Sequence, residues 1–137
     1  MILRTGIDLI EIGRLSAAVD RHGERFLTRI FTPAELEHCA GKGESLAVRF
    51  AAKEAVSKAL GTGIGPVSWQ EIEIHGGEYE APAIILHDRA ERIAKELRLT
   101  NWLITSLMSA AEIKNTAFLY FAFKSWVWNT LVSHKSD

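Results

Sequence analysis

Apolar residues recur at different spacings along the chain, and each spacing predicts a kind of element. Residues 2–9 are rich in Ile and Leu, which predicts a buried first strand with Asp8 near its end. Residues 11–22 carry apolar side chains every three or four positions, as in an amphipathic helix. A short helical segment follows at residues 24–31. We therefore expect one strand and then two helices in this part of the chain.

A strong helix start lies at Thr32-Pro33-Ala34-Glu35. Thr32 can cap the helix, Pro33 suits its first turn, and Glu35 is placed to complete a capping box. This helix is expected to run to about Ala40, with residues 41–43 as its exit.

The next helix has two different halves when its residues are placed at 100° steps. One half is small and apolar, consisting of Ala51, Ala52, Ala55, Val56, Ala59 and Leu60. The other half is polar, consisting of Lys53, Glu54, Ser57 and Lys58. We expect this helix to pack closely through its small side chains.

The rest of the chain predicts strands and one more helix. Residues 69–75 alternate between apolar and polar side chains and are expected to pair with residues 82–86. Asp88 is placed to cap the last helix. Two apolar runs, residues 102–108 and 116–123, predict a pair of strands. The expected fold class is α+β, a single small domain with an antiparallel sheet and helices packed largely on one side.

Composition supports one domain and narrows the class of partner. The chain has 137 residues, of which 47% are hydrophobic and 24% charged, the balance of a soluble globular domain. A net charge of -1 gives no general attraction to nucleic acid or to acidic membranes, so neither is expected as a partner. Cys39 is the only cysteine and the apolar N-terminal run is interrupted by charges, so we expect a cytoplasmic protein.

Two carboxylates and one loop are candidates for chemistry. Asp8 follows Gly6-Ile7 at the end of a strand, where an aspartate more often ends the strand or caps the next helix. Glu54 has Lys58 four residues later, which in an isolated helix would be a solvated ion pair of little energy. Neither residue alone establishes a site.

The glycine-rich loop Gly61-Thr62-Gly63 follows its helix, whereas common phosphate-binding loops precede one. The C-terminal end of a helix is negative, so a phosphate would bind here only through loop amides, Lys58 or a bridging cation. The plainest interpretation is that Gly61 ends the helix in a left-handed conformation.

Arginines cluster early in the chain. Arg14, Arg21, Arg25 and Arg29 lie within 16 positions and alternate with apolar residues such as Phe26. Most surface arginines are only solvated, but this group is also suited to an acidic helical partner.

Several separate stretches, in order, resemble the holo-acyl-carrier-protein synthase family. They are GIDLIE at 6–11, RF at 25–26, FTPAEL at 31–36, RFAAKEA at 49–55 and KALGTG at 58–63. The resemblance covers residues 2 to about 99. It implies a transferase that moves the phosphopantetheine arm of coenzyme A onto a serine of acyl carrier protein and releases adenosine 3',5'-bisphosphate. It also implies a homotrimer with active sites at subunit interfaces.

The resemblance also assigns roles to residues. It implies that Asp8 and Glu54 bind Mg²⁺, that Arg49 and Lys58 lie near phosphates, and that Gly61, Thr62 and Gly63 border the nucleotide. Arg14, Arg21 and Arg25 would face the acidic carrier protein, with Phe26 and Arg29 in the same surface. Asp8, Glu54 and Lys58 are then the candidate catalytic residues, and Glu54 is our hypothesis for the base that takes the serine proton.

The similarity weakens after Trp102. The family places a histidine near the nucleotide on this strand, but here the sequence reads Ser-Leu-Met-Ser at 106–109, with no histidine between His87 and His134. This change keeps open an alternative, a non-catalytic module that binds acyl carrier protein or a nucleotide. We divide the chain into a transferase domain, 1–124, and an apolar tail, 125–137, which is expected to cover the sheet or a neighbouring subunit.

Overall fold

The computed structural model describes residues 3–76, 81–108 and 116–124. Three strands form an antiparallel sheet in the order β1 (Leu3–Glu11), β5 (Thr116–Lys124), β4 (Trp102–Met108). The middle strand pairs with both neighbours, and Gly6 lies opposite Phe121 in the β1–β5 register. The predicted pairing of the last two strands is confirmed. The predicted loop between them and the tail 125–137 lie outside the described residues.

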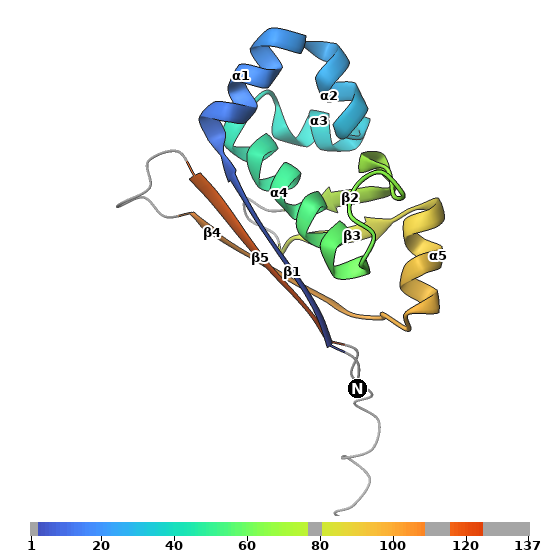
Figure 1. The fold of residues 1–137 in the computed structure, drawn as a ribbon. Coiled ribbons are helices and arrows are strands. Elements are labelled where there is room, and N and C mark those ends of the chain that lie inside the picture. Colours follow the sequence, from blue (N-terminus) through green and yellow to red (C-terminus); the bar gives the residue numbers. More distant parts are fainter. Residues whose placement is uncertain (1–2, 77–80, 109–115, 125–137) are drawn as a thin grey trace, which may run out of the picture.

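The helices pack on one side of this sheet (Figure 1). They are α1 (Ile12–His22), α2 (Glu24–Ile30), α3 (Pro33–Cys39), α4 (Gly43–Leu60) and α5 (Asp88–Glu96). The longest, α4, runs along the sheet, with α1 to α3 gathered near its N-terminal half and α5 near its C-terminal end. The predicted α+β class is confirmed.

The remaining strands form a separate sheet. A short 3-10 turn, η1 (Trp69–Glu71), leads into β2 (Ile72–His75), which pairs antiparallel with β3 (Ala83–Leu86). The side chains of Ile72 and Ile74 are buried, as their alternation predicts. The expected strand pairing is therefore present, although the described residues form two sheets and not one.

The first strand is buried on one face only. Gly6 is buried and Asp8 and Ile10 are partly buried, on the face toward α4. The alternate residues Leu3, Ile7 and Leu9 are 56%, 55% and 51% exposed. The prediction of a fully buried strand is thus wrong for a single chain, because no described element covers the outer face of β1.

Two helix ends have the caps predicted from the sequence, and one has a different cap. Thr32 and Glu35 form the predicted capping box, with both reciprocal hydrogen bonds present. Gly61 ends α4 at a φ of 82°, as predicted. Asp88 does not cap α5. The carboxylate of Glu71 takes that role, since its Oε1 accepts a hydrogen bond from the N–H of Arg89 at 2.9 Å.

Two of the four residues in the polar half of α4, Lys53 and Ser57, are buried. Lys53 donates from Nζ to the carbonyls of Trp69 at 2.9 Å and Ile72 at 2.6 Å, and pairs with Glu35 Oε2 at 2.7 Å. The side chains of Lys53 and Glu35 are both 0% exposed. These contacts occur because α4 is covered on several sides, by β1 and β5 on one and by α3, β2 and η1 on another.

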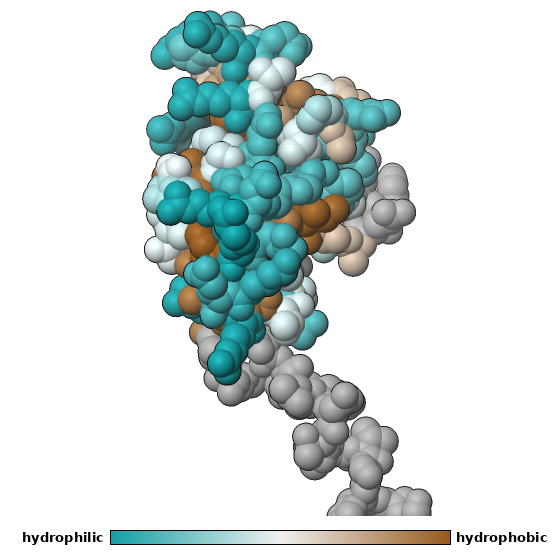
Figure 2. All heavy atoms as spheres, turned by 90° about the vertical axis from the view of Figure 1, so that its right-hand side faces the viewer, coloured by the Kyte–Doolittle hydropathy of each residue, from teal (hydrophilic) through white to brown (hydrophobic). Residues whose placement is uncertain are grey.

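Seen from the side of α5, the described surface is mostly hydrophilic, with smaller apolar areas between polar side chains (Figure 2). Among the described residues, no helix is long and apolar enough to span a membrane.

A candidate active site between β1, α1 and α4

Two predicted site residues meet across the interface of β1 and α4. Lys58 Nζ lies 2.7 Å from Asp8 Oδ1 and also donates to the carbonyl of Ile7 at 3.1 Å. Asp8 is supplied by the strand and Lys58 by the last turn of the helix, 50 positions later. The Lys58 side chain remains 48% exposed, so it is accessible to a further anion.

Glu54 joins this pair from one turn earlier on α4. Burial raises the pKa of the Glu54 carboxyl, and the charge of Asp8 raises it further, while Lys58 opposes both effects. Asp8, Glu54 and Lys58 line the same cavity, which is the geometric observation that groups them. The structure thus brings together the three candidate catalytic residues.

These side chains line a cavity of about 450 Å³. Its other lining residues are Leu9, Ile10, Arg14, Leu15, Ala18, Phe26 and Phe50. Charged groups therefore stand beside a largely apolar wall contributed by β1, α1, α2 and α4. A cavity of this kind suits a ligand with both an anionic and a less polar portion.

The close packing of β1 on α4 depends on Gly6. A Cβ at this position would lie 1.8 Å from the carbonyl oxygen of Ala55. The strand approaches the helix backbone so closely only because glycine has no side chain. This contact fixes Asp8, two residues further along the strand, beside Glu54 and Lys58.

The donor set fits Mg²⁺ better than a metal held wholly by protein. No group of three or more His, Cys, Asp or Glu within the described ranges is arranged to hold a metal ion. Mg²⁺ is commonly bound by one or two carboxylates, with water and substrate phosphates as the other ligands. Asp8 and Glu54 supply two carboxylates. Burial, and after it the charge of Asp8, raises the pKa of Glu54, and a divalent cation would offset the repulsion between the two carboxylates.

Arg49 lies elsewhere. It is 4% exposed, and its guanidinium donates to the carbonyls of Gly76 at 2.8 Å and Ser45 at 3.3 Å. It does not line the Asp8 cavity. Its contact with a phosphate stays a prediction, since the structure places it toward the end of β2.

The loop of Gly61, Thr62 and Gly63 is adjacent to Lys58, but its amides are already used. The N–H of Gly61 donates to Lys58 O at 3.0 Å, and the N–H groups of Thr62 and Gly63 donate to Ser57 O at 3.2 and 3.1 Å. The loop thus satisfies carbonyls of α4 and has no free amide cradle in these three residues. Its position beside the nucleotide also stays a prediction.

The predicted partner surface divides into two parts. Arg14 and Phe26 reach the cavity itself. Arg21, Arg25 and Arg29 are exposed on α1 and α2. These helices lie next to one another at the same end of the molecule (Figure 1). Arg14 therefore lies at the cavity, and the other three arginines are exposed on the two helices that supply part of its wall.

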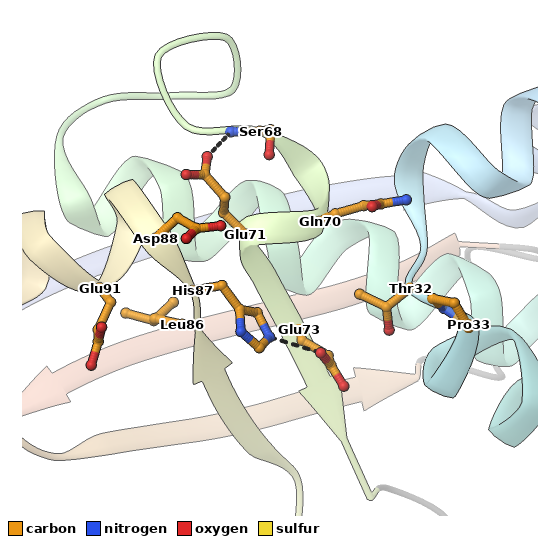
Figure 3. A pocket seen from close by; sticks show the side chains of 10 residues that line it. All are labelled: Thr32, Pro33, Ser68, Gln70, Glu71, Glu73, Leu86, His87, Asp88 and Glu91. Atoms are coloured by element: carbon orange, nitrogen blue, oxygen red, sulfur yellow. Dashed lines mark hydrogen bonds and ion pairs between the residues drawn. The ribbon is translucent and has the colours of Figure 1, made fainter.

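A second hollow, of about 590 Å³, was not expected from the sequence. Figure 3 shows His87 pointing toward Glu73, whose Oε2 lies 2.8 Å from the His87 Nε2. Burial would raise the pKa of Glu73, but hydrogen bonds with His75 and His87 outweigh it and lower that pKa. The alternation of Glu73 and His75 on the outer face of β2 was the available signal.

This second hollow is poorly suited to a phosphate. Its lining includes the four carboxylates of Glu71, Glu73, Asp88 and Glu91 and no lysine or arginine. Phosphates would be repelled by this charge. The cavity at Asp8 is therefore the better candidate for an active site.

Comparisons with known proteins show the family to which the chain is similar. The model of the 4'-phosphopantetheinyl transferase superfamily matches residues 4–117. A holo-[acyl-carrier-protein] synthase of Moorella thermoacetica is 54% identical over 99 residues, covering 70% of this chain and 77% of the relative.

Two crystal structures show the same fold. The holo-[acyl-carrier-protein] synthase of Helicobacter pylori, in complex with coenzyme A, matches with a TM-score of 0.75 and 30% identity, over 88% of this chain and 99% of that one. That of Bacillus anthracis, in complex with CoA (3',5'-ADP), has a TM-score of 0.64 and 32% identity, over 90% and 96%.

Proposed function

The chain belongs to the 4'-phosphopantetheinyl transferase superfamily, among its holo-acyl-carrier-protein synthases, and we propose that it moves phosphopantetheine from coenzyme A to a serine of acyl carrier protein. The observation that carries this proposal is the meeting of Asp8, Glu54 and Lys58 in one cavity. The coenzyme A complex of the Helicobacter pylori relative supports the choice of donor.

In the proposed reaction, the serine oxygen forms a bond to the phosphorus that carries pantetheine. The bond between this phosphorus and the bridging oxygen of the pyrophosphate breaks, and adenosine 3',5'-bisphosphate leaves with the electron pair. Glu54 takes the serine proton, a role for which a carboxylate with a raised pKa is suited. Lys58 lies beside the carboxylates and offers its exposed ammonium to the phosphates.

Asp8 and Glu54 are the residues that would hold Mg²⁺. When bound, the ion would polarise the phosphoryl oxygens and offset their charge. Asp8 positions Lys58 through their ion pair, and Gly6 holds both relative to Glu54.

We also propose that the protein works as a homotrimer in the cytoplasm. The exposed apolar residues of β1 support assembly, because such a row is more stable when a neighbouring subunit covers it. Light scattering of the full chain and of a chain lacking residues 125–137 tests this. A full-length trimer that dissociates or aggregates on truncation is expected; a monomeric full-length protein would contradict it.

The function is tested by weighing the carrier. Purified protein is incubated with apo acyl carrier protein, coenzyme A and Mg²⁺, and the carrier is analysed by mass spectrometry. A gain equal to one phosphopantetheine is expected. Stable binding to the carrier without any mass gain would instead favour the alternative, a non-catalytic binding module.

A further inference from the structure

Arg4 stands on the same face of β1 as Gly6 and Asp8 and points to the end of α4. Its Nη1 donates to the carbonyl of Ala59 at 3.1 Å, across 55 positions of sequence. The same nitrogen lies 3.0 Å from where a Cβ on Gly61 would be. The guanidinium is therefore held at the C-terminal end of the helix, beside the glycine loop.

The C-terminal end of α4 disfavours a bound anion unless a positive charge lies nearby. A helix C-terminus carries a partial negative charge, and the amides of residues 61–63 already donate to helix carbonyls. Arg4 supplies a permanent positive charge at this place and also satisfies the carbonyl of Ala59.

Arg4 and Lys58 thus place two cationic groups along the contact between β1 and α4. Lys58 is anchored at Asp8, and Arg4 is anchored at the carbonyl of Ala59, the next residue of the helix, with Gly6 between Arg4 and Asp8 on the strand. Within the described residues, one nitrogen of the Arg4 guanidinium has an acceptor, so the group retains donors that can face a ligand.

We propose that Arg4 is a positioning residue of the transfer reaction, which offsets the negative end of α4 and so permits a phosphate of coenzyme A to lie against the loop of residues 61–63. The inference rests on the proposed function and extends it to a residue outside the carboxylate cluster. Arg4 acts through the helix end and takes no part in bond making.

Three substitutions separate charge from packing. Arg4→Lys keeps the charge, Arg4→Gln keeps a hydrogen-bond donor without charge, and Arg4→Met removes both but keeps length. Arg92→Gln, on the exposed side of α5, is the control for loss of one positive charge. Coenzyme A binding is measured by calorimetry at two salt concentrations, alongside KM and kcat for transfer and the melting temperature.

Arg4→Gln is expected to raise KM and Kd for coenzyme A about fivefold, with kcat within about twofold and a weaker salt dependence. Arg4→Lys should stay within about twofold of wild type, and Arg92→Gln should change nothing. Unchanged coenzyme A affinity in Arg4→Gln, or an equal loss in Arg4→Lys, would overturn the inference. A wild-type protein that binds coenzyme A without transfer would refute the proposed function and leave the affinity comparison intact.

Discussion

Gly6 lies directly against the carbonyl of Ala55, so that a methyl group at position 6 would come within 1.8 Å of that oxygen. This contact sets the distance between β1 and α4, the two elements that supply the carboxylates of the site. The position of Asp8 relative to Glu54 is therefore determined by backbone packing as well as by charge.

Replacing Gly6 by alanine should force the strand away from the helix. We expect a loss of about 1–3 kcal/mol in the free energy of unfolding and a large loss of transfer activity, measured by denaturant unfolding and by the carrier mass assay. Gly13→Ala is the matched control, because nothing lies within 4 Å of its added Cβ. It should be neutral or slightly stabilising, and equal effects at both positions would contradict the role of Gly6.

Lys53 is expected to matter for stability more than for chemistry. Lys53→Met leaves the carboxylate of Glu35 buried without its cation, which costs about 3–5 kcal/mol of unfolding free energy. Lys95→Met, which breaks an exposed pair with Glu91, should stay within about 0.5 kcal/mol. Thermal and denaturant unfolding measure both. A Lys53 variant as stable as the Lys95 variant would show that the buried pair is dispensable.

Glu54→Gln should separate activity from stability. The raised pKa of Glu54 means that the folded protein binds its proton more tightly than the unfolded chain, so stability falls as pH rises from the ordinary glutamate range to the folded pKa. Glutamine does not ionise, so the Gln variant does not lose stability in this way and is expected to be at least as stable as wild type at neutral pH. Its transfer rate should fall by about 100-fold or more.

The pH dependence of the transfer rate tests whether Glu54 is the base. In wild type, transfer should fall on the acid side as Glu54 takes a proton, and this fall should move to lower pH as the Mg²⁺ concentration rises, because a divalent cation favours the charged carboxylate. Near full turnover in Glu54→Gln would exclude this residue as the base.

The exposed arginines of α1 and α2 are expected to set the affinity for the carrier. Arg25→Glu should raise KM for acyl carrier protein about tenfold and leave KM for coenzyme A unchanged, because repulsion replaces attraction to an acidic partner. Arg92→Glu makes the same charge change on α5 and should have little effect. Similar effects of the two variants on KM for the carrier would argue for a nonspecific charge effect.

Local signals were enough to predict several elements. The Thr32–Glu35 capping box and the Gly61 helix end depend on residues near in sequence, and both are present. Strand pairing at residues 102–108 and 116–123 followed from apolar runs and is also confirmed.

Long-range burial could not be predicted in the same way. Lys53 was assigned to a polar face, yet carbonyls from η1 and β2 and the carboxylate of Glu35 surround its ammonium. Asp88 looked like a cap, but a carboxylate 18 positions from Arg89 took that role. Each error came from a partner distant in sequence, which no local pattern contains.

The candidate site likewise contains residues that could be predicted from the sequence and residues that could not. Asp8 and Glu54 were paired by resemblance, and the structure explains the pairing through the contact of Gly6 with α4. Arg49 was expected among the phosphates, but its guanidinium donates to the carbonyl of Gly76, because it lies on a different side of α4 from Glu54. The cluster of Glu73 with two histidines was missed, since its members are brought together by the hairpin.

The central claim is that transfer takes place at Asp8, Glu54 and Lys58 and not at the Glu73 hollow. It is tested most directly by weighing apo acyl carrier protein after incubation with coenzyme A, Mg²⁺ and each of four proteins: wild type, Asp8→Ala, Glu54→Ala and Glu73→Ala. We predict a phosphopantetheine mass gain with wild type and Glu73→Ala, and none with Asp8→Ala or Glu54→Ala. Modification by the Asp8 and Glu54 variants at the wild-type rate would contradict the account.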